Sequence, residues 1–299
     1  MSTPAFFFPR SVAEAVDVMD SYDGAAKLVA GGTALTLMVQ QRLVSPQALV
    51  SLRDVPGLGE VLVDEDSGLL RIGALVTHAA AARHPLVRRH APLLADSLAV
   101  VGNAQVRSAA TVGGVLAEAD YASDPPATLR ALDAEVAAHG LAGERTIGVG
   151  ELLLGFYQTA LAPAEVVTEV RVPVLPAGTG SAYLKYTSRS HEDRPCVGVA
   201  AIVGLADDGS CADLRVAVGA ACDAPLRLGD VEQQIRGRRL DGATLSEFAD
   251  AYADRIDPVS DVRGSAWYRR EMVRVWVRRA IEQALLRSGA HEHSKERAQ

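Results

Sequence analysis

Short apolar runs and a glycine pair form the clearest pattern in the first fifty residues. The run 27–30 predicts a buried strand, which Gly31-Gly32 ends. Thr33 is a residue type that caps helices, and the helix predicted after it has an apolar face made of Leu35, Met38, Val39 and Leu43. Residues 48–52 predict a second strand. Strand, glycine turn, helix and strand together predict a compact βαβ unit.

Helices and strands are mixed in the rest of the first 175 residues. Strands are predicted at 69–72, 134–139 and 166–172. Helices are predicted from the capping box Ser11-Val12-Ala13-Glu14 to about Asp20, from Thr77, from Pro92 to about Val101, and after Asp124-Pro125-Pro126. We expect Asp124 to cap the last of these helices and Thr111 to Gly114 to form a glycine-rich turn. The pattern is typical of an α+β fold.

Beyond residue 176 the pattern changes to a hairpin followed by helices. Residues 175–180 predict a linker, and apolar positions then alternate over 197–205 and 214–218 on either side of an Asp-Asp-Gly turn. The last third predicts helices that end in an arginine-rich helix over 267–287.

These patterns divide the chain into two domains and a tail. We expect one domain over 1–176, with lobes at about 1–55 and 56–176. A second domain of antiparallel sheet and helices is expected over 177–290, and a disordered tail over 291–299.

Composition excludes several classes of function. A net charge of −7 provides no basic excess for binding nucleic acid, and no apolar run approaches the about 20 residues of a membrane span. The N-terminus lacks the pattern of a secretory signal, so we expect a cytoplasmic protein. Three cysteines without a CxxC pair predict neither a metal site nor an iron–sulfur site in this chain. His78, His84, His90 and His139 show no ligand spacing and are expected at the surface.

Two glycine pairs carry the candidate chemistry. Gly31-Gly32 lies between a predicted strand and helix, where backbone amides and a helix N-terminus favour a pyrophosphate. Thr111-Val112-Gly113-Gly114 is a second such segment, and two of them suit a dinucleotide. Plain tight turns are the alternative for both. Because GxGxxG and Gly-Lys-Ser/Thr motifs are absent from the sequence, it favours neither a Rossmann domain nor a nucleoside triphosphatase.

Five segments, taken in order, resemble the flavoprotein chain of molybdenum hydroxylases, the family of the aerobic carbon monoxide dehydrogenase medium subunit and the xanthine dehydrogenase flavin domain. The first is the opening 8–15, and the next is Lys27 to Leu35. The others are 102–134, the stretch 183–193, and the closing helix with Tyr268-Arg269 and Arg278-Arg279-Ala280. The resemblance covers the whole chain and implies a two-lobed FAD module of the vanillyl-alcohol-oxidase (PCMH) type with a C-terminal domain.

The resemblance also implies the residues that bind FAD. They are Lys27, Leu28, Val29, Ala30, Gly31, Gly32, Thr33, Ala34, Val101, Thr111, Gly113, Gly114, Asp124, Val167 and Lys185. The first segment would hold the pyrophosphate, and Thr111 to Gly114 would add further amides and a hydroxyl. Asp124 would accept a hydrogen bond from a flavin sugar hydroxyl, and the two valines would pack near the rings. Lys185 would lie beside the cofactor, although a solvated strand lysine is the alternative from its surroundings alone.

The chain departs from the family pattern at three positions. Ala110 and Val115 replace a glycine and an asparagine around the second glycine pair, and Arg194 stands where an aromatic or aliphatic residue often faces the flavin. The loss of one amide contact is typically worth about 0.5–1.5 kcal/mol, so we still expect FAD to bind.

What the resemblance implies for function is electron transfer without a catalytic acid or base. A large molybdopterin-binding subunit would hydroxylate the substrate. A small subunit with two 2Fe-2S iron–sulfur clusters would reduce the FAD of this chain, which would reduce an external acceptor. A dimer of heterotrimers is the expected assembly. The last helix carries several arginines that would lie either at an interface with a partner or in solvent: Arg269, Arg270, Arg274, Arg278 and Arg279. The alternatives are a stand-alone FAD-dependent oxidoreductase of the enolpyruvoyl-glucosamine reductase type and a flavin-free scaffold.

Overall fold

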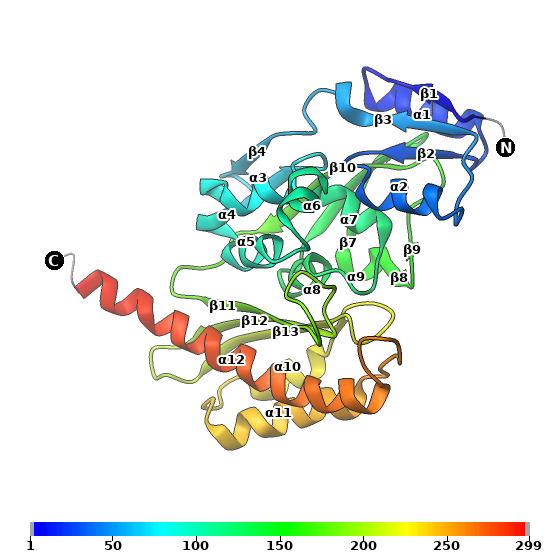
Figure 1. Cartoon of the computed structure of the whole chain (residues 1–299). Coiled ribbons are helices and arrows are strands. Elements are labelled where there is room, and N and C mark those ends of the chain that lie inside the picture. The colour runs from blue at the N-terminus through cyan, green and yellow to red at the C-terminus, as the bar shows by residue number, and fades with distance from the viewer. Residues whose placement is uncertain (1–2, 297–299) are drawn as a thin grey trace.

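The computed structural model describes residues 3–296, and its first lobe is a three-stranded parallel sheet (Figure 1). Its strands are β1 (Ala5–Phe7), β2 (Ala26–Val29) and β3 (Ala48–Ser51), in the order β1-β3-β2, with helices α1 (Val12–Ser21) and α2 (Thr33–Gln40) and the short 3-10 helix η1 (Leu52–Asp54). The predicted βαβ unit and the Ser11 cap are confirmed. Two details were wrong: Gly32 rather than Thr33 is the N-cap of α2, and α2 ends at Gln40, before Leu43.

The second lobe is an antiparallel sheet in the order β4-β5-β10-β6-β7, with most of its helices on the chain between β5 and β6. Its strands are β4 (Val61–Asp64), β5 (Leu69–Gly73), β6 (Glu135–Gly140), β7 (Gly143–Gly148) and β10 (Val166–Pro173). Its helices are α3 (His78–Arg83), α4 (Pro85–His90), α5 (Pro92–Ala99), α6 (Ala104–Ala109), α7 (Val112–Glu118), α8 (Pro125–Ala131) and α9 (Val149–Leu152). A separate two-stranded sheet pairs β8 (Leu153–Gly155) with β9 (Gln158–Thr159). The three predicted strands and the helices after Thr77, Ala91 and Asp124 are confirmed, whereas 112–114 is the first turn of α7 rather than a glycine turn.

The third part is a four-stranded sheet, β11-β12-β13-β14, followed by three helices (Figure 1). Its elements are β11 (Gly180–Tyr186), β12 (Val197–Leu205), β13 (Cys211–Gly219), β14 (Leu226–Arg227), α10 (Gly229–Ile235), α11 (Gly242–Arg255) and α12 (Ala266–Glu296). The β12–β13 pair confirms the predicted hairpin. Helix α12 continues into the segment 291–299, where the sequence predicts disorder, and 297–299 lie outside the described residues.

Apolar residues cover both faces of the third sheet. On one face, Ala200 and Ile202 of β12 pack in a core shared with the second lobe. On the other face, Val199 and Ala201 pack in a core shared with α11 and α12. This explains why β12 is apolar at nearly every position rather than alternating with polar residues. None of the described helices combines the length and apolar composition needed to cross a membrane.

Most of the arginines of α12 have a partner within the chain. Arg269 is fully buried, donates to the Ala220 carbonyl at 2.9 Å and pairs with Asp261 at 2.6 Å. Three other arginines bond to acidic or carbonyl groups of α11, α12 or the loop between them: Arg270 to Ile256, Arg274 to Asp250 and Glu271, and Arg278 to Glu282. Arg279 lies over the Trp276 ring.

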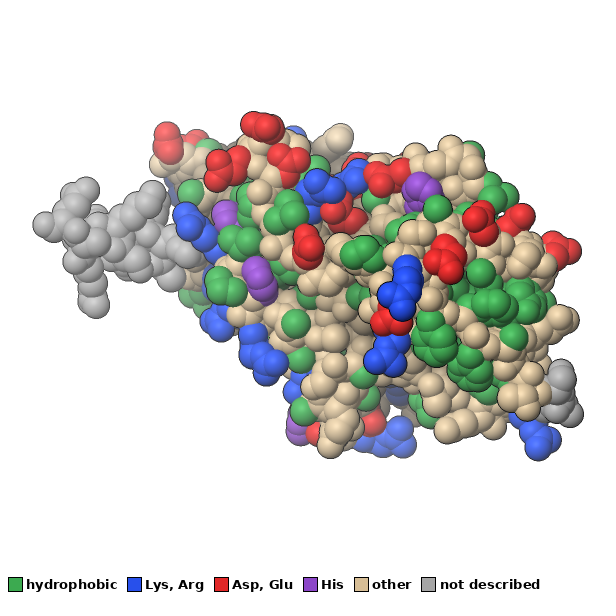
Figure 2. All heavy atoms as spheres, turned by 90° about the horizontal axis from the view of Figure 1, so that it is seen from above, with side chains coloured by type: hydrophobic (Ala, Val, Ile, Leu, Met, Phe, Trp, Pro, Cys, Tyr) green, Lys and Arg blue, Asp and Glu red, His purple; other side chains and the backbone are tan. Residues whose placement is uncertain are grey.

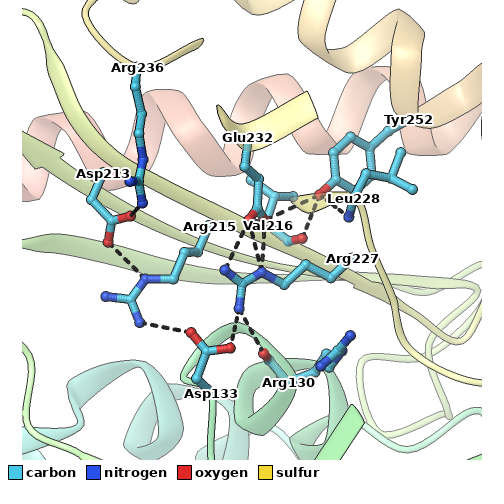
Figure 3. Close-up of polar contacts among 10 residues, drawn as sticks. All are labelled: Arg130, Asp133, Asp213, Arg215, Val216, Arg227, Leu228, Glu232, Arg236 and Tyr252. Carbon is cyan, nitrogen blue, oxygen red and sulfur yellow. Dashed lines mark hydrogen bonds and ion pairs between the residues drawn. The ribbon is translucent and has the colours of Figure 1, made fainter. Parts of the chain in front are cut away.

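A polar cluster joins the second lobe to the third sheet (Figure 3). Arg227 of β14 pairs with Asp133, which follows α8, and with Glu232 of α10 at 2.9 Å. The buried Glu232 also accepts the Val216 backbone N–H at 2.8 Å. Tyr252 donates its hydroxyl to the Val216 carbonyl at 2.7 Å, so each buried polar group drawn here has a partner.

Candidate functional site

A cavity of about 610 Å³ lies where the three parts of the chain meet. Its volume is in the range of pockets that bind cofactors. Its walls come from β2, α2, the residues after α5, the start of α7, the segment before α8, and β11 with the loop that follows it. All fifteen residues predicted to bind FAD line it, although they come from segments far apart in the sequence: Lys27, Leu28, Val29, Ala30, Gly31, Gly32, Thr33, Ala34, Val101, Thr111, Gly113, Gly114, Asp124, Val167 and Lys185.

The first glycine segment offers free backbone donors to the cavity. Gly32 takes a left-handed conformation, with φ of 69°, and caps the eight-residue helix α2. Within the described part of the chain, the backbone N–H groups of 31–34 have no protein acceptor. The first N–H groups of a helix lack partners in the helix and favour an anion. This donor set fits the diphosphate of a dinucleotide.

Gly31 joins the two glycine segments by close packing. A Cβ atom on Gly31 would lie 1.8 Å from the carbonyl oxygen of Ala109 and 2.6 Å from its carbon. No side chain fits there, because both atoms belong to the backbone. The glycine therefore lets the β2–α2 turn touch the end of α6, just before the second segment.

The second segment differs from the expectation that it supplies free amides. Thr111 caps α7 by accepting the Gly114 N–H at 3.1 Å, and the Gly113 N–H donates to the Ala74 carbonyl at 3.0 Å. The Val112 N–H likewise has a backbone acceptor. Two features of this segment are left for a ligand. The Thr111 hydroxyl can still donate its proton, and Gly114 has no side chain to block the approach of a ligand to the backbone.

His78 is buried beneath this segment, so the expectation of a surface histidine was wrong for it. Its Nε2 donates to the Thr111 carbonyl at 3.2 Å, and Nδ1 has no partner among the described residues. Burial lowers the pKa of His78 to about 4, only partly offset by that hydrogen bond. The ring is therefore neutral near pH 7. The signal in the sequence was its place directly after the capping residue Thr77 and before four consecutive alanines.

Asp124 and Lys185 form a buried ion pair at the cavity wall. Their side chains are 4% and 8% exposed, and Nζ lies 3.1 Å from Oδ2. The Tyr183 hydroxyl donates to the other carboxylate oxygen at 2.8 Å. Asp124 therefore does not cap α8 with its side chain, contrary to the expectation, and the alternative of a solvated Lys185 is wrong. Sequence reasoning named Tyr183 only as the start of the resembling stretch 183–193 and did not assign it to the site.

Arg194, from the loop after β11, also lines the cavity. Its guanidinium lies 2.8 Å from the buried carboxylate of Asp120, which also accepts the Tyr157 hydroxyl at 3.3 Å. Burial raises the pKa of the neighbouring Glu118 to about 7, Asp120 raises it further, and Arg194 lowers it. The third part of the chain thus contributes two cations, Lys185 and Arg194, to the lining of the cavity.

Helix α2 forms an apolar rim beside the cavity. It has no buried residue, although Leu35, Leu37 and Met38 all line the cavity. Exposed large apolar residues of this lobe also include Phe6 and Phe8. Figure 2, which views this end of the molecule from above, shows the densest group of apolar side chains on its right-hand side, with others spread singly over the same face.

Metal-binding chemistry has no support in the described residues. They contain no group of three or more His, Cys, Asp or Glu side chains placed to hold a metal ion. Cys196, Cys211 and Cys222 are buried and unpaired, and burial raises the pKa of each thiol.

Two family descriptions match consecutive parts of the chain. Residues 2–175 match the FAD binding domain in molybdopterin dehydrogenase, and residues 182–284 match the CO dehydrogenase flavoprotein C-terminal domain. The 6-hydroxypseudooxynicotine dehydrogenase complex subunit alpha of Paenarthrobacter nicotinovorans is 34% identical, covering 96% of this chain and 97% of that protein. The carbon monoxide dehydrogenase medium chain of Afipia carboxidovorans is 32% identical, covering 94% and 96%.

Solved structures agree in fold. Carbon monoxide dehydrogenase from Hydrogenophaga pseudoflava, in a form that lacks the Mo-pyranopterin moiety of the molybdenum cofactor, matches with a TM-score of 0.92 and 31% identity, covering 96% of this chain and 98% of that one. Quinoline 2-oxidoreductase from Pseudomonas putida 86 matches with a TM-score of 0.88 and 30% identity, covering 95% and 97%. These matches confirm the predicted α+β class and the flavoprotein resemblance. The chain therefore belongs to the FAD-binding flavoprotein family of the molybdopterin dehydrogenases.

Proposed function

We propose that this chain holds FAD in the cavity and passes electrons between a partner's iron–sulfur clusters and an external acceptor. The observation that carries the proposal is the meeting of all fifteen predicted residues around one cavity whose free amides fit a diphosphate. The free N–H groups of 31–34 would bind the phosphates, and Asp124 would accept a hydrogen bond from a sugar hydroxyl. FAD supplies the electron-transfer chemistry when it is bound.

The chain's own residues position the cofactor and control its surroundings. Val101 and Val167 would pack against the rings, and the apolar side chains of α2 would keep water from that side. Lys185 and Arg194, each paired with an aspartate, would place fixed charges in the lining of the cavity. No catalytic acid or base is assigned among the residues of this chain, whose role in the proposal is to hold and orient the cofactor.

The partners are proposed from the relatives, which are named as a complex subunit and as medium chains. A large molybdopterin-binding subunit and a small subunit with two 2Fe-2S clusters would complete the complex, as a dimer of heterotrimers. Such names favour a subunit over a stand-alone oxidoreductase.

The domain boundary is proposed near residue 176. The first domain would cover 1–176 and the second 177–290, and the gap between the two family matches, 176–181, supports a junction there.

Rapid-mixing measurements of flavin reduction test this proposal. We expect the organic substrate to reduce the flavin in the assembled complex but not in the isolated chain, which should show flavin absorbance alone. The control is dithionite, which should reduce the flavin in both samples. Reduction of the isolated, metal-free chain by the organic substrate would contradict the electron-transfer role.

A further inference from the structure

The sequence around Asp124 explains why its carboxylate is free to face the cavity. Asp124 is the N-cap of α8, but Pro125 and Pro126 occupy the first two helical positions. A capping side chain accepts from the N–H at the second or third helical position, and proline has none at the second. The backbone of Asp124 is helical, with φ of −74° and ψ of −50°, instead of the extended form usual for a cap.

Two side chains from the third part of the chain hold this carboxylate. Tyr183 and Lys185 are two residues apart on β11 and therefore point to the same side of the sheet. They donate to different oxygens of Asp124, at 2.8 and 3.1 Å, and Lys185 also donates to the Val100 carbonyl at 2.9 Å. Each carboxylate oxygen keeps a lone pair for a ligand.

Gly198 makes room for the Tyr183 hydroxyl. It is the cross-strand partner of Lys185 on β12. A Cβ atom on Gly198 would lie 2.4 Å from the Tyr183 hydroxyl oxygen and 3.2 Å from the ring carbon that bears it. Any side chain here would push the hydroxyl away from Asp124, because the tyrosine is buried on its other sides.

We propose that Tyr183 and Gly198 are positioning residues for FAD: they fix the Asp124 carboxylate in the cavity, so that the C-terminal domain completes a site built mainly by the N-terminal domain. The inference rests on FAD binding at this cavity. Neither residue was among the fifteen predicted from the sequence, and neither lines the cavity. Both act through Asp124.

The electrostatics of Asp124 provide a readout that a purely structural role would not change. Burial raises the pKa of Asp124 to about 6; Lys185 and Tyr183 lower it, and Asp120 raises it. Since the folded pKa exceeds the ordinary value, protonated Asp124 stabilises the protein at low pH, and this contribution is lost as pH rises through about 6. FAD affinity should instead rise as pH rises through about 6. Only the ionised carboxylate can accept hydrogen bonds at both of its oxygens, including one from a sugar hydroxyl.

The experiment is a titration of the full-length apoprotein with FAD between pH 5 and 8, followed by flavin fluorescence. We expect Tyr183→Phe and Gly198→Ala each to weaken binding about tenfold at pH 7, the usual effect of losing a hydrogen bond to a charged group. Both variants should also move the pH midpoint of binding upward from about 6, since Asp124 loses a donor that lowers its pKa. Asp124→Asn should remove the part of this pH dependence that has its midpoint near 6, whereas a part due to Glu118, which also lines the cavity and has a pKa of about 7, should remain.

Two variants of the same strands serve as matched controls. Tyr186→Phe removes a hydroxyl from β11 that bonds to Tyr268 outside the cavity, and Gly204→Ala on β12 adds a Cβ at 3.5 Å from Asp213, an ordinary contact. Both should bind FAD like the wild type. Unchanged affinity and pH midpoint in the Tyr183 and Gly198 variants, or an equal loss in the controls, would overturn the inference. A wild type that does not bind FAD would instead contradict the proposed function.

Discussion

The two glycine pairs at the cavity have similar sequences but differ in what their backbones do. In Gly31-Gly32 the N–H groups have no protein acceptor within the described residues, and Gly32 is left-handed. In Gly113-Gly114 both N–H groups have acceptors inside the protein. A glycine pair can thus expose backbone donors to a ligand or allow two segments to pack closely, and hydrogen-bond partners decide between these roles.

Close packing also distinguishes Gly31 from Gly32. Gly31 and Gly113 lie against backbone, at Ala109 and Ala74 respectively, where a Cβ atom would clash at under 3.0 Å. A Cβ atom on Gly32 would meet nothing closer than the Thr36 hydroxyl oxygen at 3.4 Å, but this residue requires a positive φ. The first segment therefore combines one packing glycine with one conformational glycine.

The largest effect is expected for Gly31→Ala. The new methyl group would overlap the Ala109 carbonyl and force the two segments apart, which should lower the free energy of unfolding by about 2–3 kcal/mol and reduce FAD affinity as well. Urea denaturation and FAD titration measure the two quantities. Gly59→Ala is the control, since a Cβ there meets nothing within 4 Å. Equal behaviour of the two variants would show that the segments do not touch.

A pH effect is expected from His78, which supports the second segment. The folded pKa, about 4, is below the ordinary value, so its contribution to stability is present above pH 6.5 and is lost as pH falls toward 4. Between pH 7 and 5 the wild type should lose on the order of 2 kcal/mol more unfolding free energy than His78→Leu. Parallel pH profiles of the two proteins would contradict a buried neutral histidine at this position.

The smallest effect on stability, with the sharpest contrast in binding, is expected for Gly32→Ala. An alanine in the left-handed region costs about 1–2 kcal/mol. Gly57→Ala is a matched control, because Gly57 also has a positive φ, of 81°, but does not line the cavity. We expect similar denaturation midpoints for the two variants and weaker FAD binding only for Gly32→Ala. Weakened binding in both would assign the loss to stability rather than to the phosphate site.

The sequence predicted several elements correctly where their signals are local, although it missed helix α7 at the cavity wall. The capping box at Ser11, the apolar run before Gly31 and the Asp-Asp-Gly hairpin turn each depend on neighbouring residues. The βαβ unit and the α+β class followed from these signals. The resemblance supplied the fifteen cavity residues, which no periodicity would have grouped.

What the sequence could not predict depends on contacts between distant segments. Asp124 has the residue type of a helix cap, yet its partners are Tyr183 and Lys185, about sixty positions later in the chain. His78 is buried because the second glycine segment covers it. The sequence of α12 alone left open that its arginines are solvated. In the structure Arg269 is fully buried and pairs with Asp261 of the preceding loop. Only the folded chain brings these groups together.

The most direct test of FAD binding at this cavity is the flavin content of the purified full-length chain. The chain should contain one FAD per polypeptide, and acid precipitation should release it intact into the supernatant, because no residue of the cavity is assigned a covalent bond to it. Gly31→Ala purified in parallel should contain less. Flavin that stays with the precipitated protein, FMN in place of FAD, or full occupancy in Gly31→Ala would contradict non-covalent FAD binding at this cavity.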